Sequence, residues 1–253
     1  MKGYEAVSKT SLVSRTPVAI RIDGKAFHTL TRGFDKPFDN ILHNAMCATM
    51  KYLCENIEHC VVGYTQSDEI SLIMCDYATL TSEGWFSNAV QKMASVSASM
   101  ATMIFNKVFA EEVYALDEDK RGAYFEKNGS IKLAMFDSRA FNLPEAEVNN
   151  YLLWRQQDAT RNSIQMVAQA NFKHKELHGK SCDELQELLF SERGINWNNY
   201  PVPFKRGTCC IKVPREVRPG VVRNKWELDG NIPIFSADRD YIGNILEAVR
   251  KEK

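Results

Sequence analysis

The sequence predicts an α+β fold in which an antiparallel sheet carries two helices on one face and an α-rich C-terminal extension follows. Two observations lead to this prediction. Strand-like and helical patterns follow one another in the order βαββαβ up to about residue 145, and beyond Pro144 the patterns are mainly helical. The βαββαβ order is typical of the ferredoxin-like arrangement. We therefore expect a first domain over residues 1–145 and a C-terminal region over residues 146–253, with helices and small β-hairpins.

The first four elements follow from apolar spacing. Residues 18–22, "VAIRI", predict a strand, and residues 38–57 carry apolar side chains at helical spacing. Residues 60–74, "CVVGYTQSDEISLIM", contain two strand-like runs around the polar tetrad "QSDE". This pattern predicts a β-hairpin with its tip at the tetrad.

The last two elements of the first domain are a helix and a strand. A helical stretch from about Trp85 to Val113 is rich in Ala, Ser and Met, and such small residues let a helix lie close to a sheet. Residues 130–144 resume a strand-like character, which Pro144 ends.

The C-terminal region has its own signals. Residues 149–172 predict an amphipathic helix, and Ser181 with Glu184 has the spacing of a capping box at the start of another helix. Asp229-Gly230 lies between two strand-like runs in "KWELDGNIPIF" and predicts a short hairpin. We expect these helices and a small sheet to pack on the first domain.

Composition limits the possible functions. The 253 residues are 44% hydrophobic, and 32 basic residues balance 32 acidic ones. A site for a polyanion must therefore be a local patch. Because the N-terminus has no apolar leader and no stretch approaches 18 uninterrupted apolar residues, we expect neither secretion nor a membrane span, and predict a cytoplasmic enzyme.

The cysteines and histidines favour no metal centre. Seven cysteines, an odd number with two of them adjacent, predict reduced thiols. Cys54, His59 and Cys60 fit no common zinc spacing. A second cluster is better explained as solvated side chains near a helix end, and it consists of His174, His178 and Cys182.

Acidic residues at strand ends point to chemistry. Asp23 ends the first strand, while Asp68 and Glu69 lie at the hairpin tip. In a βαββ unit that strand is adjacent to the hairpin, so the carboxylates meet at one edge of the sheet. Neighbouring carboxylates repel unless a cation neutralises them, and oxygen ligands select Mg²⁺, which completes its coordination with water and substrate phosphates. The pattern therefore predicts a phosphate-bearing substrate.

The residues around the first acid suit a phosphate. Gly24 lets the backbone approach a ligand closely, and the amides of "GKAFH" can wrap a triphosphate. Lys25 and Lys36 supply nearby cations.

Ordered motifs carry a resemblance to a known family. The segments "RIDGKAFH", "KPFD", "YTQSDEISLI", "FDSRAF", "YLLWRQQDATRNS", "GINWNNYP" and "FKRGT" are similar, in unbroken order, to those of the tRNA(His) guanylyltransferase family and its guanylyltransferase-like relatives. The resemblance implies a palm domain, as in polymerases and nucleotidyl cyclases, and Mg-dependent nucleotide addition to the 5′ end of tRNA in the 3′-to-5′ direction. It also implies a homotetramer that uses GTP or another NTP, and ATP, as substrates.

The resemblance also assigns residues. It implies that Asp23, Asp68 and the Gly24 carbonyl hold two Mg²⁺ ions, and that Glu69 shapes the catalytic site. The residues that it places at the nucleotide are Asp23, Gly24, Lys25, Ala26, Phe27, His28, Lys36, Ser67 and Asp68. For tRNA we expect a local basic surface in the C-terminal half, with the candidates Arg155, Arg161, Asn162, Lys173, Lys175, Lys205 and Arg206.

One departure from the family pattern bears on the substrate. Where eukaryotic members carry His-Ile-Asn-Asn, residues 160–163 read Thr-Arg-Asn-Ser. This favours the guanylyltransferase-like branch, which repairs 5′-truncated tRNA against a template, over a dedicated tRNA(His) enzyme that adds G at position −1. A nucleotidyl cyclase-like enzyme on the same palm and a noncatalytic RNA-binding module are further hypotheses. The C-terminal motifs disfavour the former, and the paired carboxylates disfavour the latter.

Overall fold

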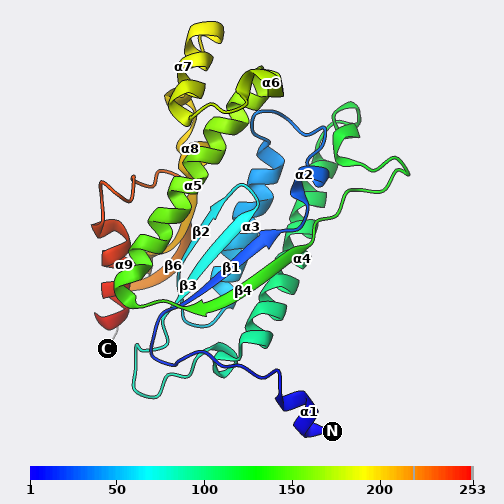
Figure 1. Cartoon of the computed structure of the whole chain (residues 1–253). Coiled ribbons are helices and arrows are strands. Elements are labelled where there is room, and N and C mark those ends of the chain that lie inside the picture. The colour runs from blue at the N-terminus through cyan, green and yellow to red at the C-terminus, as the bar shows by residue number, and fades with distance from the viewer. Residues whose placement is uncertain (219, 252–253) are drawn as a thin grey trace.

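The computed structural model describes residues 1–218 and 220–251 and is built on one antiparallel sheet. Its strand order is β4-β1-β3-β2-β5-β6 (Figure 1). The strands are β1 (Val18–Gly24), β2 (Cys60–Gln66), β3 (Glu69–Met74), β4 (Phe136–Asn142), β5 (Thr208–Arg218) and β6 (Val221–Asp229). The first four have the ferredoxin-like order, so the predicted fold class is confirmed.

Two helices cover one face of the sheet, as predicted. They are α3 (Asn40–Asn56) and α4 (Val90–Ala115), which lie side by side behind the strands in Figure 1. Ile20 and Ile22 of β1 point into the core that these helices close, where they meet Met50 and Phe105. The alternation along β1 thus sends every second residue to this core.

The opposite face is also covered. The long helix α5 (Glu145–Asn171) crosses it in front of the strands in Figure 1, and α9 (Asp240–Lys251) lies beside the sheet. Ala19, Ile73 and Leu152 belong to this second core. Side chains of β1 that alternate with Ile20 and Ile22 therefore face α5, and these include Arg21 and Asp23.

The C-terminal β-structure differs from the prediction. The Asp229-Gly230 hairpin and the separate small sheet are wrong, because β6 ends at Asp229 and pairs back along β5. Strand β5 in turn pairs with β2, with Val62 opposite Ile211, so the hairpin extends the first-domain sheet. The Asp229 carboxylate accepts hydrogen bonds from the Asn231 amide and the Tyr241 hydroxyl, which turns the chain toward α9 instead of into another strand.

A third core forms at the far end of α5. The helix α7 (Cys182–Arg193) packs there through Leu185 and Leu189 against Ile164. The predicted capping box is confirmed, with Ser181 and Glu184 bonded reciprocally at the start of α7. The remaining short helices are α1 (Lys2–Ala6), α2 (Phe27–Leu30), α6 (His174–Leu177) and α8 (Val202–Arg206), with 3₁₀ turns η1 (Trp85–Asn88), η2 (Glu118–Lys120), η3 (Gly122–Tyr124) and η4 (Trp197–Asn199).

Two element boundaries moved from their predicted positions. The helix expected from Trp85 starts at Val90, because residues 86–88 have left-handed backbone angles in η1. The strand expected over 130–144 is β4 alone, and the residues before it form a loop. Within the described ranges, none of the helices is both long and apolar enough to span a bilayer.

Candidate active site at the edge of the sheet

The end of β1 and the β2–β3 turn meet at one edge of the sheet. Asp23 lies opposite Glu69 in the antiparallel register, and the Gly24 amide donates to the Asp68 carbonyl oxygen over 3.0 Å. Ser67 and Asp68 form the turn between the two strands. The structure therefore brings together the acids that the sequence predicted to be neighbours.

The backbone around these acids is held in uncommon conformations. Ala26 has φ 55° and Ser67 has φ 48°, so each lies in the left-handed region. A Cβ added to Gly24 would lie 2.2 Å from the Phe27 ring, which leaves room only for glycine. The chain after β1 thus folds back tightly beside the carboxylates, and strain of this kind is common at ligand sites.

Electrostatics at the site disfavour two free carboxylates. Burial raises the pKa of Asp68 above its ordinary value, and the negative charge of Asp23 raises it further. Such a pair fits a bound cation. Within the described ranges no three or more side chains of the His, Cys, Asp and Glu types group together as a metal cage. A hard cation bound here would keep open coordination positions for water and phosphate, as Mg²⁺ does in proteins.

Glu69 forms a buried ion pair with α5. Its Oε2 accepts from Arg155 Nη1 over 2.8 Å, and the two side chains are 10% and 6% exposed. Glu69 Oε1 has no hydrogen-bond partner in the described structure. Burial raises the pKa of Glu69, while the positive charge of Arg155 opposes that rise. The guanidinium of Arg155 lies inside the protein beside Glu69, so its burial does not favour the predicted contact with tRNA.

A cleft of about 710 Å³ borders the carboxylate edge. It is lined by the predicted nucleotide residues Gly24, Ala26, Phe27, His28, Lys36, Ser67 and Asp68. Asp23 and Lys25 lie outside this lining, and Lys25 is exposed. The Phe27 ring is mainly a core residue, since it packs against Phe105 and Phe136.

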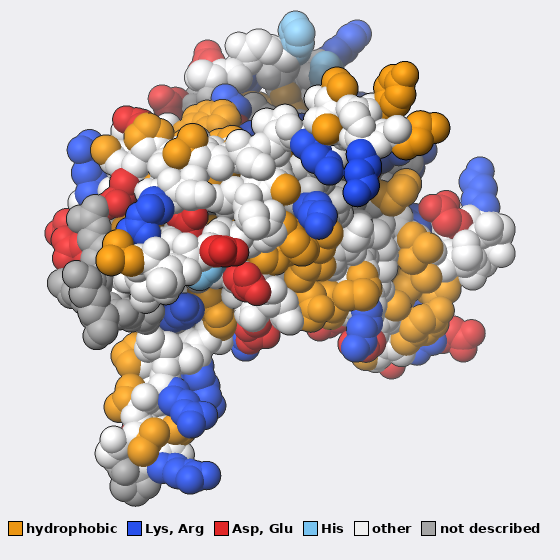
Figure 2. Space-filling view, turned by 90° about the horizontal axis from the view of Figure 1, so that it is seen from below, with side chains coloured by type: hydrophobic (Ala, Val, Ile, Leu, Met, Phe, Trp, Pro, Cys, Tyr) orange, Lys and Arg blue, Asp and Glu red, His pale blue; other side chains and the backbone are white. Residues whose placement is uncertain are grey.

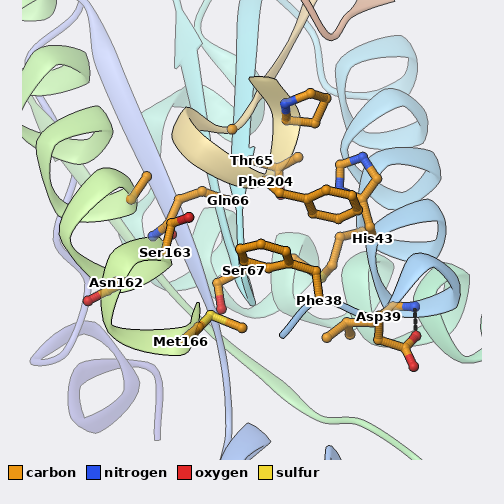
Figure 3. Close-up of a pocket in the computed structure, with 15 residues that line it drawn as sticks. Phe38, Asp39, His43, Thr65, Gln66, Ser67, Asn162, Ser163, Met166 and Phe204 are labelled. Carbon is orange, nitrogen blue, oxygen red and sulfur yellow. Dashed lines mark hydrogen bonds between the residues drawn. The ribbon is translucent and has the colours of Figure 1, made fainter. Parts of the chain in front are cut away.

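A second, much smaller cavity of about 70 Å³ adjoins this cleft (Figure 3). It lies between α5, the start of α3, the β2–β3 turn and α8. Four residues line both spaces, namely Asp39, Leu42, Ser67 and Met166. Asn162, a predicted tRNA contact, lines this cavity.

The other predicted tRNA contacts are divided between interior and surface. The predicted Lys205 contact is not favoured, since this side chain is buried and its Nζ donates to the Asn198 carbonyl over 2.6 Å. Arg161 is exposed on α5 and paired with Asp158. Lys173 and Lys175 are exposed at α6, and Arg206 is half-buried.

Three residues beside the acids were not singled out from the sequence. In the pairing of β1 with β4, Asp137 lies opposite Asp23 and Arg139 lies opposite Arg21, all on the α5 side. Arg21 Nε is buried without a hydrogen-bond partner among the described residues. Alternation in "FDSRAF" was the available signal, because Asp137 and Arg139 are two residues apart and share a face.

Family comparisons agree with this geometry. A family model described as tRNAHis guanylyltransferase matches residues 1–144, and one described as Thg1 C terminal domain matches residues 146–227. The chain belongs to the tRNA(His) guanylyltransferase family. It is a nucleotidyltransferase with the palm-like fold of this family.

Solved structures and sequences of relatives extend over most of the chain. A bacterial tRNA(His) guanylyltransferase (Thg1)-like protein in complex with ATP is 46% identical, with a TM-score of 0.84 and coverage of 97% of this chain and 96% of that one. The GTP complex of such a bacterial protein is 44% identical, with a TM-score of 0.80 and the same coverage. The tRNA(His) guanylyltransferase of Saccharomyces cerevisiae is 31% identical over 206 residues, which are 76% of this chain and 80% of the relative.

Proposed function

We propose that this enzyme repairs 5′-truncated tRNA by adding nucleotides in the 3′-to-5′ direction, opposite a template base. The observation that carries the proposal is the pair Asp23 and Asp68 at the sheet edge, where Asp68 lines a cleft large enough for a nucleoside triphosphate. Family membership supplies the reaction class. GTP and ATP are the nucleotides bound by the bacterial relatives, and this supports both as substrates here.

Each residue at the edge has a role in this proposal. Asp23, Asp68 and the Gly24 carbonyl would hold two Mg²⁺ ions, which when bound neutralise the developing charge of an in-line phosphoryl displacement. The 3′-hydroxyl of the incoming NTP attacks the 5′-terminal phosphorus, a new P–O bond forms, and the bond to the leaving pyrophosphate or AMP breaks. Lys36 would meet the phosphates from the cleft, and Arg21 and Arg139 lie opposite each other on the α5 side of the sheet, beside the acids.

Specificity should come from pairing with the template. Arg161, in the tetrad that departs from His-Ile-Asn-Asn, is bonded to Asp158 of its own helix. A site with few base-reading side chains must take its selectivity from base pairing and duplex shape. We therefore favour repair over a dedicated tRNA(His) activity.

The β5–β6 hairpin is the basic surface that we propose for tRNA. Beyond its pairing with β2, it extends from the body as an arm with Lys and Arg side chains, seen at the lower left in Figure 2. The basic residues of the arm are Lys212, Arg215, Arg218, Arg223 and Lys225, against the acidic Glu216 and Glu227. Arg215 is paired with Glu227. The other basic side chains of the arm can contact phosphates. We therefore propose the arm as the tRNA-binding surface instead of Arg155 and Lys205, which are buried.

Assembly as a homotetramer remains part of the proposal, as does a cytoplasmic location. Exposed apolar side chains on α4 and before β4 support contacts between subunits, and they include Met103, Leu133 and Met135. Sedimentation at assay concentration tests the assembly, and a monomer would contradict it.

The test of function is a competition between 5′-truncated tRNAs of several identities, each with a varied template base and labelled NTPs. We expect the added base to be the Watson–Crick partner of the template base, whatever the anticodon. Strict preference for tRNA(His) and for GTP regardless of template would establish the dedicated enzyme instead.

A further inference from the structure

Lys132 is a buried cation that forms no ion pair among the described residues. It lies in the segment between α4 and β4 and is only 8% exposed. Its Nζ donates to two backbone carbonyl oxygens, that of Arg32 over 2.7 Å and that of Ala123 over 2.8 Å. The same ammonium lies 5.0 Å from the centroid of the Phe34 ring. Burying a charge costs free energy, so a lysine at this position needs a reason beyond core packing.

The Arg32 carbonyl belongs to a loop that forms one wall of the cleft beside Asp68. Residues 31–37 all line this cleft, and they include Lys36, the cation that we propose for the phosphates. None of these residues belongs to a strand or a helix. A loop without a ladder of backbone hydrogen bonds takes its shape from the few contacts that hold it. The position of Lys36 therefore depends on what fixes residues 31–37.

The segment between α4 and β4 holds this loop on the side away from the cleft. In Figure 1 the segment lies at the upper right, beside α2. The buried Phe34 ring packs against Tyr124, with centroids 4.7 Å apart. The Tyr124 hydroxyl donates to Asp39 Oδ2, which also accepts from the Asp35 amide over 3.1 Å. Lys132 adds a direct tie between the two backbones, because one ammonium binds a carbonyl of the loop and a carbonyl of the segment.

We propose that Lys132 is a positioning residue, which fixes loop 31–37 and through it places Lys36 for the triphosphate of the nucleotide. The part about Lys36 rests on the proposed function. Without the tie, the loop must be ordered when the nucleotide binds, and that ordering lowers the affinity. Lys132 itself touches neither the nucleotide nor the acids in this arrangement. Its loss should therefore weaken nucleotide binding and leave the chemical step nearly unchanged.

Equilibrium binding of ATP with Mg²⁺, in the absence of tRNA, tests the proposal. Lys132→Met keeps the apolar stem and removes both hydrogen bonds. We expect the ATP affinity to fall about tenfold, and in tRNA extension the KM for the nucleotide to rise by a similar factor with kcat within about twofold. Unchanged ATP affinity would overturn the proposal. Failure of the unmodified protein to extend tRNA would count against the proposed function alone, because ATP binding is measured without tRNA.

A double-mutant cycle tests whether Lys132 acts through Lys36. Lys36→Met alone should also lower the ATP affinity about tenfold. If Lys132 only places Lys36, the double variant should bind ATP within about twofold of the Lys36→Met protein. Losses that multiply to about a hundredfold would show independent effects and would refute the route through the loop.

Lys205→Met is the matched control for a general loss of stability. Lys205 is 9% exposed, and its Nζ likewise donates to a carbonyl, that of Asn198, and lies 5.7 Å from the centroid of the Trp197 ring. It is outside the lining of the cleft. We expect both variants to melt at lower temperature, but only Lys132→Met to bind ATP more weakly. An equal loss of ATP affinity in both variants would overturn the proposal.

A chemical rescue provides a second measurement if Lys132→Met folds poorly. Propylammonium added to Lys132→Ala supplies the missing part of the side chain with its N–H donors. We expect a saturable recovery of ATP affinity with propylammonium and none with trimethylpropylammonium, which carries the charge but no N–H donor. Equal recovery with both amines, or recovery with neither, would contradict a role for the two hydrogen bonds.

Discussion

Replacing Arg155 with Met should destabilise the protein strongly, although the arginine contacts no substrate in our proposal. The variant keeps most of the side-chain volume but leaves Glu69 buried with neither oxygen paired, since Oε1 already lacks a partner in the described structure. Removing one member of a buried ion pair costs about 3–5 kcal/mol. We expect a loss of this size in the free energy of unfolding, measured by urea denaturation at pH 8 without Mg²⁺.

The pH dependence and two further variants identify the cause. Burial raises the Glu69 pKa above 4.5, and losing Arg155 should raise it further. A raised carboxyl pKa means that the charged form is disfavoured in the folded state, so the penalty is full above the folded pKa and shrinks as pH falls through it toward 4.5. The loss at pH 5 should therefore be smaller than at pH 8.

The controls use the same helix and the same pair. Arg161→Met removes an exposed arginine that is paired with Asp158, and should cost no more than about 1 kcal/mol. Adding Glu69→Gln to Arg155→Met should restore part of the stability, because the buried charge is gone. The reasoning is refuted if Arg155→Met loses no more than Arg161→Met, or if the double variant is as unstable as the single one.

Further predictions concern the acids, the glycine and the arm. Asp23→Asn should lower nucleotide addition by roughly a thousandfold or more in a single-turnover assay with Mg²⁺, since the metal clamp supplies several kcal/mol; near-normal turnover would refute the assignment. Asp68→Asn should be equally inactive, yet should melt at a higher temperature than the unmodified protein in EDTA at pH 8, because it removes a buried charge that faces Asp23; a lower melting temperature would contradict that electrostatic argument. For Gly24→Ala we expect about 1–3 kcal/mol of destabilisation from the overlap with Phe27, and unchanged melting would show that the ring moves freely. Arg223→Ala with Lys225→Ala should make the dependence of log tRNA affinity on log salt shallower by about 1.4–1.8, whereas Lys9→Ala, at an exposed N-terminal position, should leave the slope unchanged; equal slopes in all three proteins would remove the arm from the tRNA surface.

The sequence was sufficient to predict the elements that are defined by the spacing of apolar residues within one segment. Strand β1, helix α3 and the β2–β3 hairpin appear where spacing predicts them, and their order was enough to place Asp23 beside Asp68. Pairing between strands that are far apart in the sequence could not be predicted from such local patterns. The residue pattern within 208–229 does not indicate that β5 pairs with β2. An Asp-Gly pair such as Asp229-Gly230 also occurs both in β-hairpins and in turns capped by the Asp side chain, so the local sequence does not distinguish the two.

The differences between the predicted and the observed site residues have a similar origin. Arg155 and Arg161 lie on one helix, yet the first is buried against Glu69 and the second is exposed. A charged residue on a long helix is usually solvated, and only the register of α5 against the sheet decides which one is not. Asp137 was not singled out from the sequence because it is brought beside Asp23 only by the pairing of β4 with β1.

The pairing of β2 with β5 has a consequence for the order of events during synthesis. The strand that leads into the catalytic turn stays an open sheet edge until residues 208–211 leave the ribosome, and 208 − 68 = 140 positions separate the turn from this segment. Unpaired edges of this kind are prone to join the wrong partner. A fragment that stops at residue 144, where the first matched family region ends, would keep both acids but expose β2 along its length. The boundary between the two matched regions is therefore a poor place to divide this protein.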